Sequence, residues 1–143
     1  MIKVDQPVAL IFIFTWVGFV SAISFLEAWL KFRAPGVTIP VGLGIGRLVF
    51  NALNKIEWVF ALIVIFSGFW YKAFGLEGQT AILLLIVIVL LLQTYWLLPK
   101  LDARATACIS GKTLPRSHLH LYFIGGEVIK TISLIIYGVH LLK

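Results

Sequence analysis

The chain is poor in charged residues, which soluble proteins carry in abundance. They make up 13% of its 143 residues, against about 25% in a typical soluble domain. Hydrophobic residues make up 61%, and the mean hydropathy is +1.04. A water-soluble globule of this size has too little interior to hide so much apolar surface. The shortage of charge therefore excludes a soluble domain and makes the lipid bilayer the first expected partner.

The chain also lacks the motifs of several enzyme and cofactor classes. Its one cysteine, Cys108, excludes an intrachain disulfide and a Cys-x-x-Cys redox pair. There is no Gly-x-Ser-x-Gly motif, and the glycine run at 42–46 lacks the Lys-Ser/Thr pair of a phosphate-binding loop. Two of the three histidines, His120 and His140, fall about 30 Å apart on one predicted helix at about 1.5 Å per residue, which argues against a haem held by both. We expect no cofactor and do not expect an enzyme.

Long apolar runs predict an all-α polytopic membrane protein, a single-domain bundle of four transmembrane helices. A helix of about 20 residues crosses the hydrocarbon layer. The predicted spans are 7–30, 56–72, 80–98 and 117–142.

Proline and glycine predict the breaks between the spans. The segment 31–46 is rich in both residue types, which predicts an irregular loop after the first span. Pro99 is expected to help end the third span. The segment 101–109 could then form a brief helix within the third loop.

The basic residues follow the loops, which is a membrane topology signal and not a nucleic-acid signature. The first and third loops carry eight of them, and the termini with the second loop carry three. This bias predicts an inner-membrane, multi-pass protein with both long loops in the cytoplasm and both termini periplasmic or extracellular. The eight are Lys31, Arg33, Arg47, Lys55, Lys100, Arg104, Lys112 and Arg116; the three are Lys3, Lys72 and Lys143.

The last span carries an acid and a base, Glu127 and Lys130, deep in its apolar run. A charge at that depth costs about 2.5–3.5 kcal/mol on insertion scales. On a helix, Arg116 and His120 fall on nearly the same face as Glu127. We interpret this stripe as a proton or ion pathway, or alternatively as a structural Glu127–Lys130 pair. The residues expected beside Glu127 are Arg47, Asn51, Asn54 and Glu27.

Three other acids, Glu27, Glu57 and Asp102, are predicted to lie near the cytoplasmic interface. They either pair with nearby bases in a structural cluster or form a wet vestibule leading to Glu127.

The His118-x-His120 pair suggests a metal site with Cys108 as a third ligand, since copper and zinc accept these donors. Residues two apart on a helix point to different faces. The pair could therefore bind one ion only if the helix begins after His120, and we favour interfacial histidines and no metal site.

Residues 25–58 and 97–130 together resemble a family of small bacterial integral membrane proteins with four spans. The likeness implies the architecture and brings no activity with it. The layout of four spans, a basic loop after the third and histidines at the start of the fourth is also similar to copper-resistance-D-like membrane proteins.

Three functions follow, each with the observation that would favour it. The first is a small transporter or channel-like protein, oligomeric because four short spans enclose little interior; it needs a polar cavity that includes Glu127. The second is an accessory subunit of a larger membrane complex, with a helix face buried against another chain. The third is an enzyme acting on a lipid or quinone, with a pocket near Glu27, Arg47, Asp102 and His120.

Overall fold

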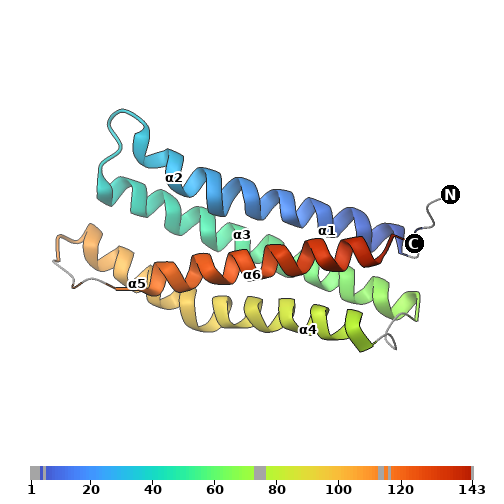
Figure 1. The fold of residues 1–143 in the computed structure, drawn as a ribbon. Helices are drawn as coiled ribbons and strands as arrows, with labels where there is room; N and C mark the ends of the chain where they lie inside the picture. The colour runs from blue at the N-terminus through green and yellow to red at the C-terminus, as the bar shows by residue number, and fades with distance from the viewer. Residues whose placement is uncertain (1–3, 5, 73–76, 113–114, 116, 143) are drawn as a thin grey trace.

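Four long helical segments make up the protein (Figure 1). The computed structural model describes residues 4, 6–72, 77–112, 115 and 117–142. The all-α prediction is confirmed for the described residues, and all four segments are long and apolar enough to cross a membrane. Their bounds are as follows: α1 (Pro7–Val20), η1 (Ser21–Glu27), α2 (Ala28–Leu30) and η2 (Lys31–Arg33) form the first; α3 (Ile39–Trp70) is the second; α4 (Glu77–Leu92), η3 (Gln93–Leu97) and α5 (Leu98–Ile109) form the third; α6 (Leu119–His140) is the fourth.

The four segments form an up-and-down bundle in which each packs against its neighbours in sequence. The first segment lies between α3 and α6, and the third segment closes the ring on the opposite side (Figure 1). Val4 and Leu142 form an isolated antiparallel bridge, which brings the two ends of the chain together. The short 34–38 loop and the junction between α5 and α6 lie at the other end, which we call the loop end.

The loop after the first span is shorter than we predicted. Helix α3 already begins at Ile39, with Pro40 in its first turn, where a proline is tolerated. Three of the glycines that suggested irregularity, Gly42, Gly44 and Gly46, lie inside this helix, and at Gly42 and Gly46 a neighbouring side chain occupies the space that a Cβ would need. The Phe32 ring lies against Gly42, and a Cβ at Gly46 would meet Lys31 Nζ at 2.7 Å.

The prediction that Pro99 helps end the third span was wrong. The helix continues through it to Ile109, and the brief helix expected in the third loop is the continuation of that span. Directly before the proline, η3 is a π-helical turn in which the Leu98 N–H donates to the Gln93 carbonyl. The wider turn lies where Pro99 lacks the N–H donor that a regular helix uses.

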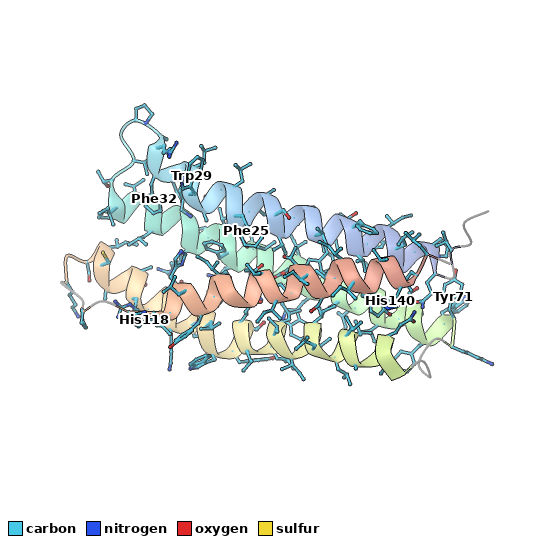
Figure 2. All side chains as sticks on the ribbon, viewed as in Figure 1. Phe25, Trp29, Phe32, Tyr71, His118 and His140 are labelled. Carbon is cyan, nitrogen blue, oxygen red and sulfur yellow. The ribbon has the colours of Figure 1, made fainter. Side chains whose placement is uncertain are left out.

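The core and the outer surface are both apolar, as expected for a bundle in lipid. Trp16, Leu53, Ile86 and Leu134 are among the fully buried side chains, while large apolar residues cover the outside. Aromatic side chains lie at both ends: Trp29 and Phe32 at the loop end, which also carries His118, and Tyr71 at the other end, which also carries His140 (Figure 2). Such belts are typical of membrane–water interfaces.

Candidate functional site

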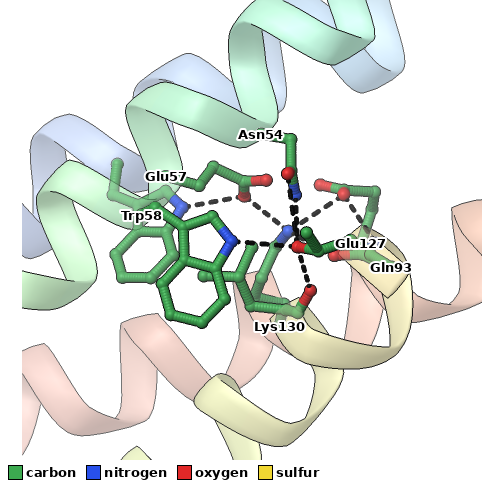
Figure 3. A network of polar contacts seen from close by, with 9 residues as sticks. Asn54, Glu57, Trp58, Gln93, Glu127 and Lys130 are labelled. Atoms are coloured by element: carbon green, nitrogen blue, oxygen red, sulfur yellow. Dashed lines mark hydrogen bonds and ion pairs between the residues drawn. The ribbon is translucent and has the colours of Figure 1, made fainter. Parts of the chain in front are cut away.

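Five polar or charged side chains meet inside the bundle, with at least one from each of the four spans (Figure 3). We call them the charged centre: Trp16, Glu57, Gln93, Glu127 and Lys130. Glu127 and Lys130 are 0% exposed, and Glu57 is 2% exposed. Without a hydrophobic driving force between helices in lipid, such interhelical hydrogen bonds are part of what holds a membrane bundle together.

The ammonium of Lys130 has three oxygen acceptors, one for each of its protons. Its Nζ lies 2.5 Å from Glu57 Oε1, 2.9 Å from Glu127 Oε1 and 2.7 Å from Gln93 Oε1. An ammonium group has three donors and no acceptor. Lys130 is therefore saturated by groups from α3, η3 and its own helix.

The two carboxylates are held by further donors. Trp16 Nε1 donates to Glu57 Oε1 at 2.9 Å, and Gln93 Nε2 donates to Glu127 Oε1 at 2.7 Å. Gln93 thus uses its carbonyl toward Lys130 and its amide toward Glu127, which sets the orientation of the amide. Gly126 permits this contact, since a Cβ there would lie 3.1 Å from Gln93 Nε2.

A smaller polar group adjoins the centre between α3 and η3. The Thr94 hydroxyl accepts hydrogen bonds from Asn54 Nδ2 at 3.0 Å and Trp58 Nε1 at 2.9 Å. The same hydroxyl donates to the Leu90 carbonyl at 2.7 Å. Asn54 therefore lies close to the centre, as we expected, but it contacts Thr94.

The charged centre lies near the middle of the apolar helices α3 and α6. Glu57 is 13 residues before the end of α3 at Trp70, and Glu127 is 13 residues before the end of α6 at His140. At about 1.5 Å per residue, both lie roughly 20 Å from the end of the bundle that carries the termini. A hydrocarbon layer of about 30 Å measured from that end encloses them.

A second feature, which we call the end pocket, lies between α2, α3, α5 and α6 at the loop end. Its volume is about 490 Å³, and its wall is mostly apolar. Three cationic side chains, Lys31, Arg47 and Arg104, line it against one carboxylate, Asp102. Arg47 and Asp102 are paired with each other. The formal charge of the described lining, with histidine neutral, is therefore positive.

Several predicted site residues lie in the end pocket and not beside Glu127. Arg47, Asn51, Asp102 and His120 all line it. Arg47 also donates from Nη1 to Thr106 Oγ1 at 3.0 Å. The expectation that Arg47 and Asn51 would contact Glu127 was wrong, because both lie one or more turns nearer the loop end than Glu57.

The other predicted positions are spread over the same end. Glu27 pairs with Lys31 at 3.2 Å and is not among the residues that line the pocket. Arg116 falls outside the described residues. Cys108 lines the pocket with His120, whereas His118 is exposed. Among the described residues, no three His, Cys, Asp or Glu side chains come together as a metal site would require.

An apolar layer separates the pocket from the charged centre. Leu97, Leu98 and Phe123 form a buried cluster against which Phe50 packs. Phe123 also lines the pocket, and it lies one helical turn from Glu127 on α6. The pocket wall thus ends at this layer, and Glu127 is not among the residues that line the pocket.

Sequence reasoning missed three members of the centre: Trp16, Glu57 and Gln93. We placed Glu57 at the interface because the second span was predicted to begin at 56. Once α3 begins at Ile39, Glu57 falls in the middle of the helix, on the same side as Asn54. Gln93 was assigned to the exit of a span that in fact continues for another sixteen residues, to Ile109.

Comparison with known proteins returns no matching family model, no matching curated protein and no matching solved structure.

Proposed function

We propose that this multi-pass membrane protein binds an anionic amphiphile of the lipid or fatty-acid class in the end pocket. The observation that carries the proposal is the combination of a mostly apolar cavity of about 490 Å³ with three cationic side chains on its wall. An apolar wall accommodates a hydrocarbon chain, and basic groups between transmembrane helices are suited to anionic head groups.

The depth of the pocket supports a head group at this position. Arg47 lies 23 residues before Trp70 on α3, which is about 35 Å at 1.5 Å per residue. A hydrocarbon layer of about 30 Å therefore ends just short of Arg47. The cationic side chains lie at the level of the lipid head groups, and the apolar wall extends toward the hydrocarbon.

The pocket brings together three of the four residues named for an enzyme acting on a lipid or quinone, Arg47, Asp102 and His120, and Glu27 is not among its lining residues. The present proposal is limited to binding and includes no catalytic step. Transport through Glu127 stays a prediction, because the pocket wall ends at Phe123. A role as an accessory subunit, an oligomeric state and the family resemblance also stay predictions. The bias of basic residues further supports a cytoplasmic location for the pocket.

Cys108 offers a direct test, because it is the only cysteine in the chain and it lines the pocket. The purified protein in nanodiscs of zwitterionic lipid is labelled with a membrane-permeant maleimide. We expect a long-chain alkyl phosphate to slow the labelling several-fold. An alcohol with the same chain should protect much less, and inorganic phosphate should not protect at all. Equal protection by the alcohol would refute the requirement for an anionic head group.

Charge variants separate the pocket from general surface charge. Lys31→Gln and Arg104→Gln each remove one cation from the wall and should weaken protection by the alkyl phosphate. Lys100→Gln is the matched control: Lys100 lies near the same end, over the Trp96 ring at 5.1 Å, and is not a lining residue. If Lys100→Gln weakens protection as much as the other two, the effect belongs to surface charge and the proposal fails.

A further inference from the structure

We infer that the charged centre is a binding site for one proton, held by Glu127 at its Oε2 atom. This site lies beyond the apolar layer of Leu97 and Phe123, and it does not depend on ligand binding in the end pocket. The inference rests on the count of charges in the centre, on the hydrogen bonds already made there, and on one enclosed oxygen.

The count of charges leaves an excess. Two carboxylates, Glu57 and Glu127, face one ammonium, Lys130, and all three are enclosed. The other elements packed against them contribute only neutral groups, the Trp16 indole and the Gln93 amide. With every group ionised, the centre carries one uncompensated negative charge inside the hydrocarbon layer. An unpaired buried charge is among the costliest arrangements in a protein, and neutralisation is the usual outcome.

The hydrogen bonds leave no internal group to compensate that charge. All three protons of Lys130 are directed at oxygens of Glu57, Glu127 and Gln93. The Trp16 indole N–H, a single donor, is used by Glu57. The charge can therefore be removed only by something that binds from outside, and a proton is the smallest such ligand.

Geometry places the proton on Glu127. Its Oε1 already accepts from Gln93 and Lys130, while its Oε2 is enclosed and has no hydrogen-bond partner. Thr131 Oγ1, one turn further on the same face of α6, is a second enclosed oxygen without a partner. Protonation forms one O–H bond at Glu127 Oε2 and breaks one O–H bond of the hydronium ion that delivers the proton, which leaves as water.

The apolar layer of Leu97 and Phe123 separates the bound proton from water in the end pocket. Leu97 and Phe123 lie between Glu127 and the end pocket, and Glu127 is 0% exposed. Exchange with water therefore needs a movement of this layer. The site would hold its proton in the conformation described here and release it only when the bundle opens.

The test is infrared spectroscopy of the full-length protein in nanodiscs at neutral pH. A protonated carboxylic acid has a carbonyl band well separated from carboxylate bands, and the band shifts when water is exchanged for D₂O. We expect this band in the wild type. Glu127→Gln should abolish it and still fold, since a glutamine oxygen can accept from Gln93 and Lys130. Asp102→Asn, which alters a carboxylate in the end pocket, should leave the band unchanged.

Three outcomes would overturn the inference. A band that persists in Glu127→Gln but disappears in Glu57→Gln would show that Glu57 holds the proton. The absence of the band in the wild type would show that both carboxylates are ionised. Stabilisation of the bundle by sodium ions, without the band, would assign the site to a cation. Should Glu127→Gln not fold, carbon-13 NMR of glutamate-labelled wild type tests for one protonated carboxyl group directly.

Discussion

Replacing Lys130 with methionine should destabilise the bundle more than any other single substitution in the charged centre. Methionine is unbranched and apolar, and it fills irregular core space with little strain. The ammonium, however, is the common partner of Glu57, Glu127 and Gln93. Removing one partner of a buried ion pair costs about 3–5 kcal/mol, because the other charge is left unpaired. Here the Glu57 carboxylate loses its ammonium partner, and Glu127 and Gln93 each lose a hydrogen-bond donor, so we expect a loss near the upper end, about 5 kcal/mol.

The measurement is the free energy of unfolding of purified protein in mixed micelles, from a denaturing-detergent titration followed by far-ultraviolet circular dichroism. Lys55→Met is the matched control, since Lys55 is exposed on α3 two residues before Glu57. Its cost should stay below about 1 kcal/mol, as is usual for surface positions. In the double variant Lys130→Met with Glu57→Gln, removal of one stranded charge should recover more than about 1 kcal/mol. If Lys130→Met costs no more than Lys55→Met, or the double variant recovers nothing, the three groups do not form one electrostatic unit.

Three further predictions test other parts of the structure. Gly126→Ala should cost about 1–2 kcal/mol in the same unfolding assay, because its Cβ would press on the Gln93 amide at 3.1 Å and disturb a buried hydrogen bond. The control Gly125→Ala has open space around its Cβ and should cost nothing. Equal losses of stability in the two variants would contradict the packing argument. Glu127→Leu should lower the free energy of unfolding by about 1–3 kcal/mol, since it leaves the Gln93 amide donor unsatisfied. Glu127→Gln should stay within about 1 kcal/mol of the wild type. If Glu127→Gln is the less stable of the two variants, the side chain has no hydrogen-bonding role. Cys108 should resist a membrane-impermeant maleimide in intact cells and react after permeabilisation, because the bias of basic residues predicts that its loop is cytoplasmic. Labelling of Cys108 in intact cells would show that the orientation is the opposite one.

The sequence predicted the course of the chain better than the contacts of its polar residues. The apolar runs predicted four spans, and the described residues contain four helical segments long and apolar enough to be spans. The predicted breaks were less accurate, because proline and glycine were read as interruptions. Pro40 lies in the first turn of a helix and Pro99 follows a π-helical turn. In both places the surrounding backbone accommodates the missing donor, and local composition does not reveal this.

The polar residues were also predicted only in part. Glu127 and Lys130 attracted notice because a charged residue is costly in an apolar span. Glu57 has the same depth and the same burial, but it follows a polar stretch of α3 that resembled an interface. Its position became clear only from the true start of that helix. Arg47 lies on the same helix and was expected beside Glu127, but it lies two to three turns nearer the loop end.

The sequence by itself determined that four segments form helices long and apolar enough to cross a membrane, and that charge lies inside at least one of them. Helical hydrogen bonds are local, and about 20 apolar residues suffice to specify a span, so this information is contained in short windows of the chain. Only the tertiary structure decided that Trp16, Glu57 and Gln93 meet Lys130. Gln93 is 37 residues from Lys130 and Trp16 is 41 residues from Glu57, and these contacts depend on how the helices rotate and slide against one another. In lipid that arrangement is determined by side-chain packing and by interhelical hydrogen bonds. Both kinds of contact form only once the helices have come together.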